Sequence, residues 1–127
     1  MKKIILTDNA PAPIGPYSQA VLVNNTLYCS GQIPLDAKSG ELACGDISKQ
    51  TEKVCENIGE ILKTAGMTFD NVIKTTCFLA DMVDFPQFNS VYEKFFVSKP
   101  ARSCVAVKAL PKNALVEIET IACTDAI

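Results

Sequence analysis

The sequence contains no histidine. This absence excludes the usual ligand sets for zinc and iron, the Ser-His and Cys-His nucleophile pairs, and the commonest general base. Six cysteines are present, but no two form a CxxC or other close pair, because they stand at positions 29, 44, 55, 77, 104 and 123. A glycine-rich phosphate loop is also missing. We therefore expect no metal and no organic cofactor, and we expect reduced cysteines packed in the core.

Long apolar runs and runs of like charge are also missing. No apolar stretch approaches the roughly 18 residues that a membrane span needs, and the N-terminus lacks the apolar core of a secretory signal. The net charge is −2, and the lysines do not cluster as they do on a surface that follows a phosphate backbone. We therefore expect a cytoplasmic protein that binds neither membranes nor nucleic acids.

Two segments have helical periodicity. Over residues 48–65 the apolar residues recur every three or four positions on one stripe, Asp46 or Ser48 can cap the start, and Gly66 is suited to end the helix. A second helix with one apolar stripe starts near Pro86 and stops before Pro100. Both patterns predict helices that cover one side of a larger element.

Six further segments have the alternation and β-branched content of strands, namely residues 4–7, 18–23, 27–30, 72–80, 102–108 and 115–122. The order is three strands, a helix, a strand, a helix and two strands. This order predicts a single α+β domain over residues 1–127, with two helices on one face of a mixed six-stranded sheet. Because no third helix is available for the other face, a second copy of the chain is its simplest cover.

Charged residues interrupt the two last strand-like segments. Arg102 opens one of them, and Glu117 and Glu119 lie within the other. A guanidinium matches a carboxylate through two parallel N–H groups, and a carboxylate can orient and deprotonate water. The residues alone leave alternatives open. Arg102 also suits the surface of an edge strand, and the period of two places both glutamates on the same strand face.

Five ordered motifs extend over nearly the whole chain: Ala12–Gln19 (APIGPYSQ), Ser30–Pro34 (SGQIP), Phe88–Tyr92 (FNSVY), Pro100–Val105 (PARSCV) and Val116–Glu119 (VEIE). In these motifs the chain resembles the RidA (YjgF) family of reactive imine deaminases. The resemblance implies a chorismate-mutase-like fold and a homotrimer with clefts at the subunit interfaces. It also implies hydrolysis of 2-iminopropanoate and 2-iminobutanoate to the 2-oxo acids and ammonia, without a cofactor.

The resemblance further implies roles for individual residues. Arg102 would bind the substrate carboxylate, and Glu117 would activate the water. Glu119 would then have a structural or rim role. Tyr17 would close the cleft and donate a hydrogen bond to the substrate or water, although a boundary aromatic residue would have the same pattern.

Four more residues are expected to bind substrate. Ser30 and Gly31 lie where a strand is interrupted, and glycine permits a close approach of the backbone, although an ordinary bulge would have the same sequence. Asn89 borders the apolar stripe of the second helix. The resemblance implies that Cys104 contributes its backbone N–H. Its thiol is not expected to be a nucleophile, because no histidine is present to lower its pKa.

The spacing of Arg102 and Glu117 favours a site between subunits. If the last two strands formed a hairpin, the two residues would lie about 13 Å apart along it, beyond the reach of an arginine side chain, and in the family's fold these strands are not neighbours at all. Two rival functions stay open. The same trimer could be a ligand-binding sensor of 2-oxo acids, or the protein could be an endoribonuclease, although the acidic balance and the lack of histidine weigh against the second.

Overall fold

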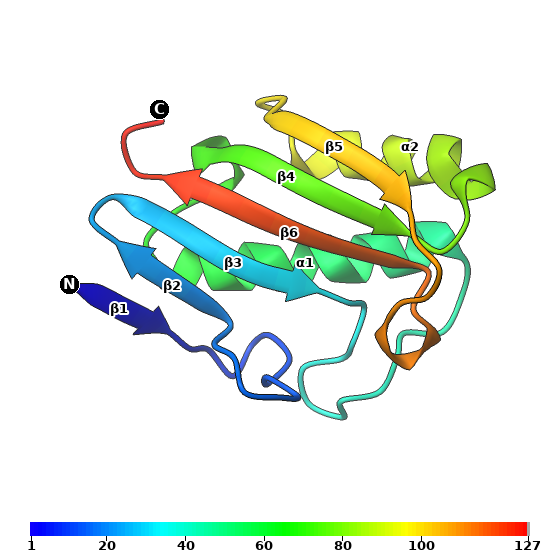
Figure 1. The fold of residues 1–127 in the computed structure, drawn as a ribbon, viewed down its shortest axis with the longest axis horizontal. Helices are drawn as coiled ribbons and strands as arrows, with labels where there is room; N and C mark the ends of the chain where they lie inside the picture. The colour runs from blue at the N-terminus through cyan, green and yellow to red at the C-terminus, as the bar shows by residue number, and fades with distance from the viewer. Residues whose placement is uncertain (127) are drawn as a thin grey trace.

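Figure 1 shows the computed structural model, which describes residues 1–126, as a six-stranded sheet with helices on one face. The strands are β1 Lys2–Ile5, β2 Ala20–Val23, β3 Thr26–Gln32, β4 Val72–Leu79, β5 Ala101–Ala106 and β6 Val116–Cys123. The helices are α1 Ile47–Thr64 and α2 Phe85–Phe95, with short 3-10 turns η1 Phe69–Asn71, η2 Met82–Asp84 and η3 Pro111–Asn113. The expected α+β class and the order of the elements are confirmed.

The strands lie in the order β1-β2-β3-β6-β4-β5. Every neighbouring pair is antiparallel except β4 and β5, which are parallel and are connected through α2. The last strand, β6, therefore lies in the middle of the sheet, and β5 forms an edge (Figure 1). The last two strands, β5 and β6, do not form a hairpin, because β4 lies between them.

Both helices cover the same face of the sheet, as expected (Figure 1). α1 begins after Asp46, whose Oδ1 accepts a hydrogen bond of 3.1 Å from the Lys49 N–H, and it ends before Gly66, whose φ is 77°. Pro86 lies in the first turn of α2, where the missing N–H has no carbonyl to bond. The apolar stripe of α1 is fully buried at Val54, Ile58, Ile61 and Leu62.

Most strand boundaries differ from the expectation by one or two residues, and three of the differences have a clear structural setting. β1 ends at Ile5, because the Thr7 N–H bonds to a side chain and not to a strand. β3 is not broken at Ser30 but continues to Gln32. β5 ends at Ala106, after which the chain turns towards η3.

The cysteines are all unpaired thiols. Cys29, Cys55 and Cys77 are buried, as expected for core residues, whereas Cys104 and Cys123 are half-buried. The expectation of a core position is wrong for Cys44, which is exposed in the loop before α1.

The second face of the sheet carries no helix within residues 1–126. Alternate residues of β6 are buried against the helices, whereas Glu117, Glu119 and Ile121 point to the opposite side. The pairing register places exposed apolar residues on this open face, with exposed fractions of 57% at Ile4, 50% at Tyr28 and 46% at Val105. An exposed apolar surface on a regular element is typical of a protein interface.

Candidate active site

A β-bulge brings Gly31 against Glu117 on the open face. The register of β3 with β6 shifts between Cys29 and Gln32, so β3 has one residue more than its partner there. A Cβ atom at position 31 would overlap Oε2 of Glu117, and glycine is therefore needed for this close approach. The alternative of a bulge at Ser30 and Gly31 is thus correct, and the same bulge makes room for the carboxylate.

A buried amide fixes the loop between β1 and β2. Gln19 is 1% exposed; its Nε2 donates to the carbonyls of Thr7 at 3.0 Å and Pro11 at 2.9 Å, and its Oε1 accepts from the Thr7 N–H at 2.8 Å. The hydroxyl of Tyr17, in the same loop, accepts a hydrogen bond of 3.2 Å from the Ile14 N–H. This role of Gln19 was not predicted from the sequence. The available signal was an amide residue at the start of a predicted strand.

The loop and the bulge line an open cavity of about 370 Å³, which we call the Glu117 cavity. Its polar lining is formed by Tyr17, Ser30, Glu117 and Glu119. Its remaining lining is formed by Ile14, Gly31, Ile33 and Pro111. A mainly apolar cavity with a few converging polar groups is typical of a small-molecule site. Four of the residues expected at the substrate thus lie together on one face.

The Glu117 carboxylate has an altered acidity. Partial burial raises the pKa of Glu117, and the negative charge of Glu119 raises it further. Within residues 1–126, no hydrogen bond or ion pair engages this carboxylate. A free carboxylate with a raised pKa is a stronger base than an ordinary surface glutamate.

The other expected residues lie at the far edge of the sheet. Arg102 belongs to the edge strand β5, but its half-buried side chain turns to the helix face, unlike a surface arginine. Its Nη1 donates a hydrogen bond of 2.8 Å to Oδ1 of Asn89. Its Cζ lies 4.8 Å from the ring centroid of Tyr92, 5.4 Å from that of Phe85 and 5.9 Å from that of Phe88. α2 therefore supplies the hydrogen-bond partner of the guanidinium and all three rings around it.

Cys104 follows Arg102 on the same face of β5 and is half-buried. Burial raises the pKa of its thiol, and the nearby charge of Arg102 opposes this effect only in part. A thiol with a raised pKa stays protonated at neutral pH and is a poor nucleophile.

Arg102 and Glu117 lie on opposite faces of one protomer. Arg102 pairs with Thr75 of β4, and Glu117 pairs with Phe78 of the same strand. Their Cα atoms are thus three residues apart along the sheet and two strands apart across it, roughly 14 Å in all. One protomer therefore holds two separate half-sites, with Arg102, Asn89 and Cys104 in one and the Glu117 cavity in the other.

Comparison with known proteins identifies the family of this chain. The chain matches the family described as Endoribonuclease L-PSP over residues 7–124. The chain belongs to this family. A Bos taurus 2-iminobutanoate/2-iminopropanoate deaminase is 53% identical over 96% of this chain and 90% of its own length. A RutC family protein of Pyrococcus horikoshii is 54% identical over 96% of this chain and 98% of its own length.

A solved structure agrees with the assignment to the Endoribonuclease L-PSP family. YyfA of Yersinia pestis, a member of the Rid protein family, has a TM-score of 0.94 and 49% identity, and the match covers 98% of this chain and 100% of that one. The resemblance to the RidA (YjgF) family is therefore confirmed.

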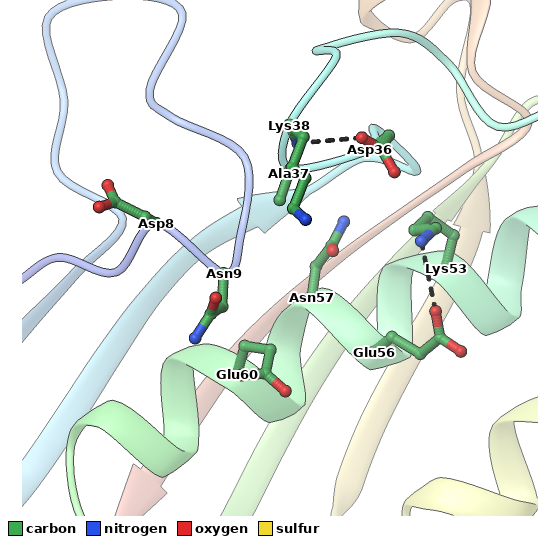
Figure 2. A pocket seen from close by; sticks show the side chains of 9 residues that line it. All are labelled: Asp8, Asn9, Asp36, Ala37, Lys38, Lys53, Glu56, Asn57 and Glu60. Atoms are coloured by element: carbon green, nitrogen blue, oxygen red, sulfur yellow. Dashed lines mark hydrogen bonds and ion pairs between the residues drawn. The ribbon is translucent and has the colours of Figure 1, made fainter.

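A second hollow, larger than the Glu117 cavity at about 730 Å³, lies between α1 and the neighbouring loops. Figure 2 shows that charged side chains of both signs surround it. Several of its polar groups bond to the protein: Lys53 pairs with Glu56 at 3.4 Å, Asp36 accepts from the Lys38 N–H at 2.9 Å, and the buried Asn57 donates to a loop carbonyl at 3.0 Å. These bonds hold the loops on α1, and none of the expected site residues lines this hollow.

Two further properties concern residues 1–126 as a whole. No three potential ligand side chains among them are grouped closely enough to hold a metal ion. Neither helix is long and apolar enough to cross a membrane. Independence from cofactors stays a prediction that an assay must test.

Proposed function

We propose that this protein is a hydrolytic deaminase that converts 2-iminopropanoate and 2-iminobutanoate to the 2-oxo acids and ammonia. The observation that carries the proposal is the pair of complementary half-sites. Arg102 offers a cation with no acidic partner among residues 1–126, and Glu117 offers a carboxylate with a raised pKa. The carboxylate of a 2-imino acid would bind to Arg102. Its imine carbon, to which water must add, would lie beside Glu117. Relatives that carry the name of this deaminase support the same activity.

The proposed catalyst is a homotrimer with a cleft between neighbouring subunits. Because the half-sites lie on different surfaces of one chain, a contact that joins them is head-to-tail, and a head-to-tail contact with a rotation of one third of a turn closes into a trimeric ring. The exposed apolar residues of the open face would be covered in this contact. Sedimentation equilibrium should give three times the chain mass of 13.7 kDa. A monomer at micromolar concentration would contradict the cleft.

In the proposed reaction Arg102 of one subunit holds the substrate carboxylate through two parallel N–H groups. Glu117 of the neighbouring subunit removes a proton from water as the water oxygen bonds to the imine carbon. The imine nitrogen takes up the electron pair and receives the proton from Glu117, which gives a tetrahedral amino alcohol and restores the carboxylate. The C–N bond then breaks, the C=O bond forms, and the hydroxyl proton passes by way of Glu117 to the leaving ammonia.

The other residues have supporting roles in this proposal. Asn89 aligns Arg102, and the backbone N–H of Cys104 polarises the reacting carbon–heteroatom bond. Tyr17 closes the cleft, and Ser30 and Gly31 form its wall. A cytoplasmic location, as expected from the sequence, belongs to the same proposal.

A sensor of 2-oxo acids and an endoribonuclease are the two alternatives to a deaminase. A sensor of 2-oxo acids would use the same half-sites but would not turn over the imine. Endoribonuclease is the description of the family, yet a chain with net charge −2 and two carboxylates in its cavity offers little attraction to a phosphate backbone.

A coupled assay separates these functions. A pyridoxal-phosphate-dependent dehydratase generates the imine in the presence of a semicarbazide trap, and release of the 2-oxo acid is timed with and without this protein. We expect faster release, less trapped imine and no effect of a chelator. Binding of 2-oxobutanoate without turnover would support the sensor, and salt-dependent cleavage of a synthetic RNA would support the ribonuclease.

A further inference from the structure

Arg102 is the only arginine of the sequence, and aromatic rings stabilise its charge where an acidic residue would be usual. The three ring centroids of α2 lie 4.8–5.9 Å from its Cζ, within the range of cation–π attraction. The single ion pair among residues 1–126 joins Lys53 to Glu56. No carboxylate of the described protomer therefore competes for this guanidinium.

Tyr92, whose ring is nearest to Arg102, is fixed from two sides. Its hydroxyl shares a hydrogen bond of 2.7 Å with Oγ1 of Thr75, and its ring stacks on Phe96 with centroids 4.3 Å apart. Thr75 is 0% exposed and is the residue of β4 that pairs with Arg102. Thr75, the neighbour of Arg102 in the sheet, thus holds in place the Tyr92 ring that Arg102 lies over.

The hydrogen bond between Tyr92 and Thr75 does not depend on pH near neutrality. Burial raises the pKa of Tyr92 to about 12, and the bond to Thr75 opposes this effect only in part. The phenol therefore stays protonated, and the ring keeps its anchor over the whole working range of the proposed enzyme.

This packing leaves part of the guanidinium free. Asn89 engages one N–H, and no other side chain or backbone group among residues 1–126 bonds to the Arg102 guanidinium. A fixed carboxylate would occupy the N–H groups that a ligand needs, whereas a ring attracts the cation without occupying them.

We propose that Tyr92, anchored by Thr75, is a positioning residue that fixes the plane of the Arg102 guanidinium for a two-pronged grip on the substrate carboxylate. The identity of that carboxylate rests on the proposed function. The fixed plane itself is a property of the protein without substrate, so the two ideas can fail separately.

Nuclear magnetic resonance of protein labelled with ¹⁵N-arginine tests the inference, because a single arginine gives a single set of side-chain signals. Thr75→Val and Tyr92→Phe remove the same hydrogen bond from opposite ends and preserve shape. We expect both to move the Arg102 Nε–H signal towards that of free arginine and to speed its exchange with water. Tyr92→Leu, which removes the ring, should move it further, and Thr75→Ser should keep the parent signal.

Thr51→Val is the matched control. Thr51 is a fully buried threonine of α1 whose hydroxyl has no hydrogen-bond partner among the described residues. Its replacement should leave the Arg102 signal and the imine hydrolysis unchanged.

Kinetics supply the second readout. We expect Thr75→Val and Tyr92→Phe to raise KM for 2-iminobutanoate about 3- to 10-fold, the usual worth of one hydrogen bond, with a smaller change in kcat. Parent-like arginine signals in all three loss variants, or altered signals with an unchanged KM, would overturn the inference. If the parent protein hydrolyses no imine, the proposed function fails, and the arginine signals still decide whether Tyr92 and Thr75 fix the guanidinium.

Discussion

The two half-sites are built in different ways. Side chains of α2 hold Arg102 in place, through three rings and Asn89. Backbone features shape the Glu117 cavity, namely the bulge at Gly31 and the loop held by Gln19. The first half-site should therefore be sensitive to the loss of a ring or a hydroxyl, and the second to the addition of a single carbon atom.

The half-sites also differ in charge. One presents a cation without an acidic partner, and the other presents two carboxylates without a basic partner, within residues 1–126. Complementary charges on two surfaces of one chain favour the head-to-tail contact of the proposed trimer. A small anionic substrate between them would meet a binding group on one side and a base on the other.

The largest effect is expected for Glu117→Gln, which removes the proposed base and keeps its shape. Imine hydrolysis should fall by about 10²- to 10⁴-fold, the usual worth of general base catalysis. Calorimetry should show that 2-oxobutanoate still binds, because Arg102 is untouched. Parent-like turnover by an intact trimer would remove Glu117 from the mechanism.

Arg102→Lys tests the opposite half-site. The rings can still attract an ammonium group, but a point charge cannot form the two parallel hydrogen bonds of a guanidinium. The variant should be almost as impaired as Arg102→Ala, for which we expect a loss of about 2–5 kcal/mol in transition-state stabilisation. Near-normal kcat/KM for 2-iminobutanoate in the lysine variant would disprove the two-pronged grip.

Gly31→Ala tests the half-site that depends on the backbone. The new methyl group would overlap the Glu117 carboxylate, so the base must shift, and we expect kcat to fall by about 10- to 100-fold. In a Glu117→Gln background the same change should cost at most a few-fold, because the base is already absent. Equal losses in both backgrounds would show that Gly31 acts independently of Glu117.

The smallest effect is expected for Glu119→Gln, and it should appear in the pH dependence. The charge of Glu119 raises the pKa of Glu117, so its removal should lower that pKa. Because the base acts when ionised, activity falls as the pH drops through this pKa. The acidic limb of the kcat/KM profile should move to lower pH, with the rate at neutral pH changed by a few-fold at most. If the acidic limb does not move, the group that titrates in it is not Glu117.

Much of the fold followed from local sequence patterns. The apolar stripes predicted both helices, and the turn residues Gly66 and Pro86 predicted where one ends and the other begins. The position of β6 between β3 and β4 was not predicted, because the pairing of distant strands leaves no local pattern. The continuation of β3 through Ser30 was missed for a related reason, since a bulge and a strand end have the same sequence.

The residues of the candidate site could be named from the sequence, but their environments could not. Nothing near Arg102 in the chain indicates that it turns to the helix face, because its three rings stand ten or more residues earlier in the sequence. Tyr92 was part of the apolar stripe of the second helix and of the Phe88–Tyr92 motif, and neither pattern gave it a role of its own. The close approach of Gly31 to Glu117 depends on two strands that are remote in the sequence.

The central position of β6 has a consequence for how the chain matures during synthesis. Residues 116–123 are made after the other five strands, yet within the sheet they alone join the β1-β2-β3 unit to the β4-β5 unit. Until they emerge, any sheet formed by β1-β2-β3 or by β4-β5 in a nascent chain has an unpaired inner edge that is open to wrong partners. The strand that joins the two units also carries Glu117, so the chain acquires the catalytic carboxylate of the proposed enzyme in the same step that closes its sheet.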